Sequence, residues 1–207
     1  NKKYPLLLFL HGAGGRGSNN AEQLYDAGSL GAFKNQSVFS EHESYLLAPQ
    51  VIEEKKWVNV SWGTLSHKMP KITSSMAMTF EVLDSIIKNI NYQIDVKRIY
   101  IMGVSMGGYG AWDALQRRPQ VFAGGVPICG GGDVSMAQLI NDIPIWAWHG
   151  EDDEVIDVSR TTSMCKALKI AKSHIKCSII ENRKHDVWVD VWNSKELWNW
   201  LFSQKLN

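Results

Sequence analysis

The sequence has no apolar run that approaches the roughly 20 residues of a bilayer-spanning helix. The run from Pro5 to Leu10 is typical of its apolar segments. Neither sign of charge is in excess, since charged residues make up 21% of the chain and the formal net charge is +1. We therefore expect no membrane span and no electrostatic attraction to nucleic acid. The expected partner is a small molecule, and the oligomeric state is left open.

Cysteine is also scarce. The chain has three, Cys129, Cys165 and Cys177, and no C-x-x-C pair that would indicate redox or zinc chemistry. We expect buried free thiols rather than a disulfide framework. No signal peptide is visible, but the first five residues lead straight into an apolar strand, as if upstream residues had been removed. This favours a secreted or periplasmic protein over a cytoplasmic one without deciding the compartment.

The sequence lacks internal repeats, low-complexity stretches and Pro- or Ser-rich linkers, so one domain over residues 1–207 is expected. Short apolar runs alternate with longer helical patterns. This alternation predicts an α/β fold with a mostly parallel central sheet flanked by helices. The predicted strands are residues 5–10, 44–48, 98–104, 123–128, 143–148 and 176–180.

Apolar residues at helical spacing follow the capping candidates Thr73 and Ser74. They are Met76, Phe80, Leu83, Ile87 and Ile90. This stripe predicts a helix that packs on the sheet. Three further helices are predicted over residues 109–116, 159–171 and 195–202.

Ligand sites of open α/β sheets lie outside the carboxyl ends of the strands. Polar or glycine-rich segments follow four of the predicted strands, at residues 11–15, 103–108, 149–153 and 182–185. Candidate functional residues are therefore sought in these four segments.

Residues 103–107 match the pattern G-x-S-x-G, in which a serine occupies a tight turn between a strand and a helix. The pattern alone is weak, but here a β-rich segment precedes it and a helical segment follows. Ser105 is therefore the candidate nucleophile. A serine hydroxyl needs a neighbouring base, usually histidine, to take its proton as it attacks.

The candidate base is His185. In this kind of site the chain order is Ser, then Asp or Glu, then His, which leaves only His174 and His185. His174 precedes the last predicted strand and so lies at its wrong end. His185 follows that strand, at the edge where Ser105 is expected.

The acid has four candidates: Asp133, Asp152, Asp153 and Asp157. An acid is needed to hold the imidazole in the right tautomer and to stabilise the imidazolium. Position along the chain does not choose among the four.

Two backbone amides are expected to bind the oxyanion that forms during acyl transfer. One is the amide of Met106, directly after the candidate nucleophile. The other comes from the glycine-rich loop after the first strand, where Ala13 is the first choice and Gly14 the alternative.

With these residues in place, nearly the whole chain resembles a carboxylesterase-like branch of the α/β-hydrolase superfamily, described as predicted peptidases or phospholipase/carboxylesterases. The resemblance depends on motifs that occur in the same order. These are Tyr4-Pro5, His11-Gly12-Ala13-Gly14, Leu47-Ala48-Pro49-Gln50, Arg98-Ile99-Tyr100, the segment from Ser105 to Gly110, Pro144-Ile145-Trp146 and His149-Gly150.

The resemblance implies that Asp153 is the acid and that His185, in the pair His185-Asp186 near Trp188, is the base. It implies a serine carboxylesterase that works through an acyl-enzyme, with neither metal nor organic cofactor. The chain begins almost at the strand that carries the oxyanion loop. We therefore expect that strands typical of the superfamily, or a further domain, precede residue 1 in a longer protein.

No segment long enough for a lid separates the fourth strand from Ile143, so an open cleft is expected. Its expected substrate-binding residues are Gln50, Trp57, Trp62 and Trp188. A feruloyl or acetyl-xylan type carbohydrate esterase and a serine peptidase are the enzymatic alternatives. A catalytically inactive binding module of the same fold is the alternative from another class.

Overall fold

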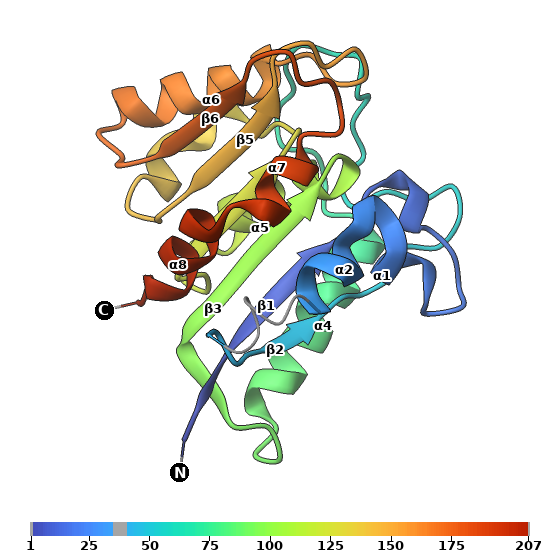
Figure 1. Ribbon diagram of the computed structural model, residues 1–207, viewed down its shortest axis with the longest axis vertical. Helices are drawn as coiled ribbons and strands as arrows, with labels where there is room; N and C mark the ends of the chain where they lie inside the picture. The colour runs from blue at the N-terminus through green and yellow to red at the C-terminus, as the bar shows by residue number, and fades with distance from the viewer. Residues whose placement is uncertain (1, 35–40, 207) are drawn as a thin grey trace.

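The computed structural model describes residues 2–34 and 41–206, whose six strands form one parallel sheet in the order β2-β1-β3-β4-β5-β6 (Figure 1). All neighbouring strands pair in parallel, which requires each connection to cross over the sheet. The strands are β1 (Tyr4–Leu10), β2 (Tyr45–Leu47), β3 (Ile94–Val104), β4 (Gly124–Ile128), β5 (Trp146–Gly150) and β6 (Lys176–Ile180).

Helices cover both faces of this sheet. The α-helices are α1 (Glu22–Tyr25), α2 (Ser29–Lys34), α4 (Ser74–Lys88), α5 (Met106–Arg117), α6 (Ser159–Ile170), α7 (Trp188–Asn193) and α8 (Lys195–Ser203). Three short 3₁₀ helices join them: η1 (Ala13–Gly15), η2 (Asp26–Gly28) and η3 (Val134–Ile140).

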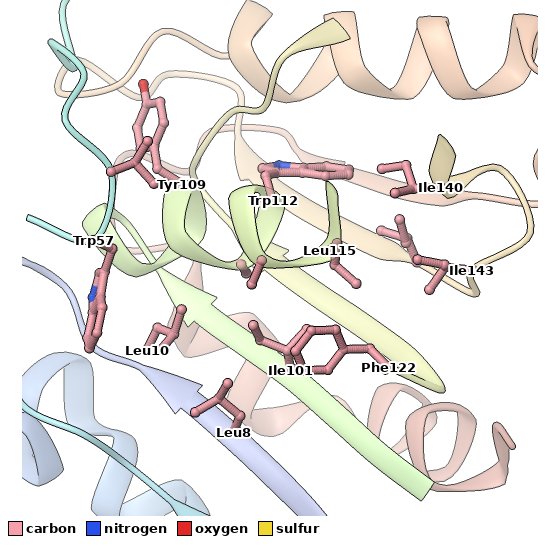
Figure 2. Packing of buried hydrophobic residues seen from close by; sticks show 14 of the residues in the cluster. Leu8, Leu10, Trp57, Ile101, Tyr109, Trp112, Leu115, Phe122, Ile140 and Ile143 are labelled. Carbon is pink, nitrogen blue, oxygen red and sulfur yellow. The ribbon is translucent and has the colours of Figure 1, made fainter. Parts of the chain in front are cut away.

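Strand β1 shows how the sheet divides the core. Successive side chains of a strand point to opposite faces. Leu8 and Leu10 join the core that α4, α5 and α6 cover, as Figure 2 shows for α5. Leu7 and Phe9 join the core under α2, α7 and α8. The strand is apolar throughout because both of its faces are buried.

The six predicted strands and their parallel arrangement are confirmed, with different ends. Strand β3 begins at Ile94 instead of residue 98, because Ile94 pairs with Tyr4 across an irregularity in the β1–β3 register. The four predicted helices are also present. The apolar stripe predicted from Met76 to Ile90 ends earlier than expected, since α4 stops at Lys88 and Ile90 is 87% exposed. Helices α1, α2 and α7, of four to six residues, are too short for periodicity to reveal.

The expectation of three free thiols is wrong for two of them. Cys165 on α6 and Cys177 on β6 form a disulfide. Cys129, after β4, is free and buried as expected. Spacing could not reveal the pair, because it is the crossover from α6 to β6 that brings the two residues together.

Between β4 and β5 the described chain contains only η3 and short loops, in agreement with the absence of a lid insertion there. Within the described residues no helix is long and apolar enough to cross a membrane.

Candidate active site

Ser105 occupies the turn between the end of β3 and the start of α5, with φ 55° and ψ −114°. A non-glycine residue at positive φ is strained and is tolerated where the surroundings impose it. Here they do so by close backbone packing. A Cβ on Gly103 would lie 2.0 Å from the carbonyl oxygen of Gly107, and one on Gly107 would lie 1.8 Å from that of Leu10. The glycines of the pattern are therefore required by the turn itself.

The structure brings Ser105, His185 and Asp153 together at the carboxyl edge of the sheet. The Nε2 atom of His185 lies 2.9 Å from the Oγ atom of Ser105. Its Nδ1 atom lies 2.7 Å from the Oδ2 atom of Asp153. An ionised carboxylate accepts only, so Nδ1 carries the hydrogen and Nε2 is left to accept the serine proton. The His185 side chain is 19% exposed, whereas that of Asp153 is fully buried.

Asp153 is held as a carboxylate in spite of its burial. Burial opposes ionisation, but hydrogen bonds from the His149 and His185 rings and from the Ile156 N–H outweigh it and hold the pKa of Asp153 well below its usual range. The buried His149 ring reaches the same Oδ2 atom through Nε2 at 3.1 Å. His149 lies in a segment that the sequence singled out, but its role as a partner of the acid was not predicted.

The other candidates for the acid and the base do not contact Ser105 or His185. Asp152 and Asp157 are exposed, and Asp157 accepts the N–H of Ser159 at the start of α6. Asp133 is buried but caps η3 and accepts the N–H of Met69 at 2.9 Å. His174 is exposed just before β6, at the amino edge of the sheet.

The three predicted oxyanion residues belong to two segments that meet near Ser105. Met106 is the first residue of α5, where N–H groups have no partner within the helix. Ala13 and Gly14 begin η1, and the preceding Gly12 approaches the nucleophile so closely that a Cβ there would lie 3.5 Å from Ser105 Cβ. In the described part of the chain no acceptor is bonded to the amides of Ala13 or Met106. Both remain available to an oxyanion.

Trp57 is a correction to the sequence interpretation. It was expected on the cleft wall, but it is 1% exposed and its indole N–H donates to the carbonyl oxygen of His11 at 2.9 Å. His11 is fully buried, donates from Nδ1 to the Gly12 carbonyl and accepts the Val51 N–H through Nε2 at 3.0 Å. Burial, together with the charge of Arg16, lowers the pKa of His11 to about 4. Trp57 and neutral His11 thus support the oxyanion loop through hydrogen bonds on its buried side.

Gln50 also contacts this loop. Its side-chain amide donates to the Gly15 carbonyl at 3.1 Å and accepts the Asn20 N–H at 2.7 Å. The contacts observed for Gln50 are thus with the protein itself, in a position that supports the loop.

Trp62 and Trp188 are partly exposed. The Arg16 guanidinium lies 5.6 Å from the Trp62 ring and also contacts the Met106 sulfur. Trp188 meets the His185 ring edge-on, with centroids 5.4 Å apart. Both remain predicted substrate contacts.

Asp26 is a site residue that the sequence did not indicate. Its carboxylate accepts the N–H of Gly12 at 2.5 Å, and a Cβ on Gly14 would lie 2.7 Å from its other oxygen. Burial raises the pKa of Asp26, although the Gly12 hydrogen bond opposes the shift. The residue lies in η2, a short irregular helix without an apolar period, so no pattern connects it with the oxyanion loop.

Among the described residues, one group could offer three metal ligands: Cys129, Asp153 and His185, whose ligand atoms lie within 4.8 Å of one another. The histidine and the carboxylate are already bonded to each other and to Ser105 and His149. We therefore assign the group to the triad, with the Cys129 thiol as a buried neighbour.

A parallel sheet with a serine on the turn after β3, an acid after β5 and a histidine after β6 defines an α/β-hydrolase. The chain belongs to the phospholipase/carboxylesterase family, whose model matches residues 1–194.

Similar proteins of known structure include a thermostable esterase, with 33% identity and a TM-score of 0.91, which matches 100% of this chain. A ferulic acid esterase, with 17% identity and a TM-score of 0.69, matches 98% of this chain and 86% of its own, and shows the fold alone. The bifunctional acetylxylan esterase/xylanase XynS20E of Neocallimastix patriciarum is 28% identical over 86 residues, or 42% of this chain. The chain spans 56% of the thermostable esterase and 12% of XynS20E.

Proposed function

We propose that this chain is a serine esterase that hydrolyses carboxylic esters through an acyl-enzyme. Ser105 attacks the ester carbonyl while His185 takes its proton and then passes it to the leaving alcohol. Asp153 keeps the imidazole oriented and stabilises its charged form. The amides of Ala13 and Met106 bind the oxyanion. Water then releases the acid by the same steps.

The continuous hydrogen-bonded order of Asp153, His185 and Ser105 carries this proposal. The free amides beside the serine hydroxyl support it, because an oxyanion needs preorganised donors. Membership of the phospholipase/carboxylesterase family and the close fold of a thermostable esterase support the choice of an ester substrate. Ester hydrolysis by this route needs only groups that the chain supplies.

The test is Ser105→Ala with a short-chain 4-nitrophenyl ester. We expect loss of essentially all turnover with an unchanged circular dichroism spectrum, since the hydroxyl is partly exposed. Ser163→Ala, an exposed serine on α6, is the matched control. Turnover by Ser105→Ala at the rate of the control would reject the assignment.

Labelling by a fluorophosphonate separates this proposal from an inactive binding module. Only a serine activated by its base reacts. We expect wild-type protein to be labelled and Ser105→Ala not to be. Folded wild-type protein that resists labelling would favour the binding module.

A carbohydrate-linked ester is the second candidate substrate. The observation in its favour is the similarity to XynS20E, described as an acetylxylan esterase/xylanase. Partly exposed Trp188, which contacts the His185 ring, offers aromatic surface to a sugar ring or a phenolic acid, whereas the Trp62 ring already has the Arg16 and Lys56 cations over it. A panel of acetyl-sugar, feruloyl and simple alkyl esters tests this, and a preference for the alkyl esters would contradict it.

A further inference from the structure

Arg160, in the first turn of α6, has a buried guanidinium without a carboxylate partner. It is 3% exposed, and no carboxylate of the described residues lies within 4.0 Å of its nitrogens. Its buried Nε–H has no hydrogen-bond partner. A guanidinium stays charged at all physiological pH values, and its preferred partners are carboxylate and phosphate.

The groups around Arg160 do not neutralise it. The guanidinium lies 5.3 Å from the centroid of the Tyr109 ring, and one of its NH2 groups bonds Nδ1 of His67. Because arginine can only donate, His67 accepts through Nδ1 and is neutral. Burial and the Arg160 charge lower the pKa of His67 to about 4. Asp133, which also acts on His67, is already paired with Lys68 at 3.7 Å.

The Tyr109 hydroxyl is a second unsatisfied group at this place. Tyr109 is 1% exposed, and its hydroxyl has no partner at normal hydrogen-bond geometry. Burial raises the pKa of Tyr109, and the nearby Arg160 guanidinium opposes this rise. Figure 2 shows its side chain on the side of α5 that faces away from the sheet. The Arg160 Nε–H and the Tyr109 hydroxyl are thus two buried donors at one place. The positive guanidinium of Arg160 is in contact there with the neutral His67 ring.

This cluster adjoins the triad from two directions. Tyr109 follows Ser105 by one turn of α5, with its N–H bonded to the Ser105 carbonyl at 3.2 Å. One turn advances a helix by about 5.4 Å. On the other side Thr161, next to Arg160, lies 2.7 Å from Nδ1 of His149, whose Nε2 contacts Asp153. The cluster is therefore connected to Ser105 through α5 and to Asp153 through Thr161 and His149.

We infer that Arg160 and Tyr109 form a subsite for a carboxylate on the substrate, which the His67 ring occupies in the free protein, so that the preferred ester is monoanionic. The inference rests on the proposed esterase function. A carboxylate displaces the His67 ring because its bonds to a guanidinium are charge-assisted, and it can take Nε–H and NH2 together. Partly exposed His67 is the one member of the cluster that solvent reaches appreciably.

The first experiment compares kcat/KM of the wild-type protein for matched esters. Mono-4-nitrophenyl adipate against 4-nitrophenyl hexanoate tests a carboxylate on the acyl side, and 4-acetoxybenzoate against its methyl ester tests one on the leaving group. In one pair we expect the anionic ester to be preferred by about tenfold to a hundredfold. Equal kcat/KM for the anionic and the neutral ester in both pairs would overturn the subsite but leave the esterase proposal intact. No turnover of any ester counts against the esterase proposal instead.

Variants then identify the residue. Arg160→Gln should reduce the anionic-to-neutral ratio to near one, whereas His67→Ala should raise it, because the carboxylate no longer has to displace the ring. Lys166→Gln, which removes one exposed charge from the same helix, should leave the ratio unchanged. If Arg160→Gln fails to fold, the anionic-to-neutral ratio of His67→Ala still tests the subsite, because the subsite predicts that this ratio rises. The assignment to Arg160 is wrong if Arg16→Gln abolishes the preference for the anionic ester. It is also wrong if His67→Ala leaves the anionic-to-neutral ratio of kcat/KM unchanged.

Discussion

At the scale of single residues, the environment of each carboxylate decides its role. Asp153 is buried and accepts bonds from two histidines, whereas Asp152, the residue before it, is exposed. Only the first can orient His185. Adjacent residues of the same type thus differ because the chain turns between them after β5.

We predict that Asp153→Asn lowers kcat for a simple ester by about a thousandfold to ten-thousandfold, because an amide can no longer fix the productive tautomer of His185. Asp152→Asn and Asp157→Asn should stay within about twofold, since neither contacts the imidazole. Steady-state kinetics of the three purified variants checks this. A large loss in Asp152→Asn or Asp157→Asn with little in Asp153→Asn would transfer the role of the acid.

Asp26 acts on the reaction through the oxyanion loop. Asp26→Ala removes the acceptor of the Gly12 N–H, so the amide of Ala13 is less well placed. We predict a fall in kcat of about tenfold to a hundredfold with little change in KM. Asp26→Asn keeps one acceptor oxygen and should lose less. Equal kcat in wild type and Asp26→Ala, measured with the same ester, would contradict this positioning role.

At the scale of elements, each crossover returns the chain to the carboxyl edge of the sheet. The serine follows β3, the acid follows β5 and the base follows β6, so three distant segments meet at one edge. The edge strand β6 leads into the loop that carries His185. The stability of β6 therefore matters for the position of the base.

The Cys165–Cys177 disulfide attaches α6 to β6 across a sequence separation of 12 residues. Closing a loop of this size stabilises the folded chain by about 3 kcal/mol in the chain-entropy account. We predict that dithiothreitol lowers the free energy of unfolding by about 2–3 kcal/mol. Urea titrations with and without the reductant measure this change.

The double variant Cys165→Ala/Cys177→Ala is the control for reduction. It should unfold at the same urea concentration with and without dithiothreitol, because the remaining Cys129 has no partner within the described residues. If the free energy of unfolding of fully reduced wild-type protein equals that of the oxidised protein, the disulfide contributes little to stability.

At the scale of the whole molecule, stability should depend on pH through buried His11. Its pKa is about 4 in the folded chain, against about 6.5 when unfolded. Between these values the unfolded chain binds more protons, so the free energy of unfolding falls as the pH drops from about 6.5 to about 4. The contribution is on the order of 3 kcal/mol. His67, with its pKa lowered in the same way, adds to the fall.

Chemical denaturation at several pH values between 7 and 4 measures this slope. His11→Gln should unfold more easily at pH 7 but show a smaller slope, since the titrating group is gone. A variant with the slope of wild type would exclude His11 as its source.

Much of the fold could be predicted because its strands are short, apolar and buried on both faces. The serine and the histidine could be selected by motif and chain order, whereas Asp153 was chosen through family resemblance. Trp57 was misplaced because a tryptophan's sequence context does not distinguish a cleft wall from a core position. Asp26 was missed because it lies in an irregular segment 14 residues from Gly12. His149 was missed although Asp153 follows it by four residues, because the loop after β5 has no regular period that would predict their contact.

The sequence by itself determined the parallel α/β architecture and the order of its strands along the chain, because hydrophobic periodicity and turn-forming glycines are local properties. Only the tertiary structure decided which carboxylate meets His185, which two cysteines pair and where Arg160 remains without a counter-charge. The contacts of His185 and Arg160 join segments from different crossovers, whereas the cysteine pair joins α6 to the strand that follows it. Their distances depend on how the helices pack on the sheet, and no local pattern records that packing.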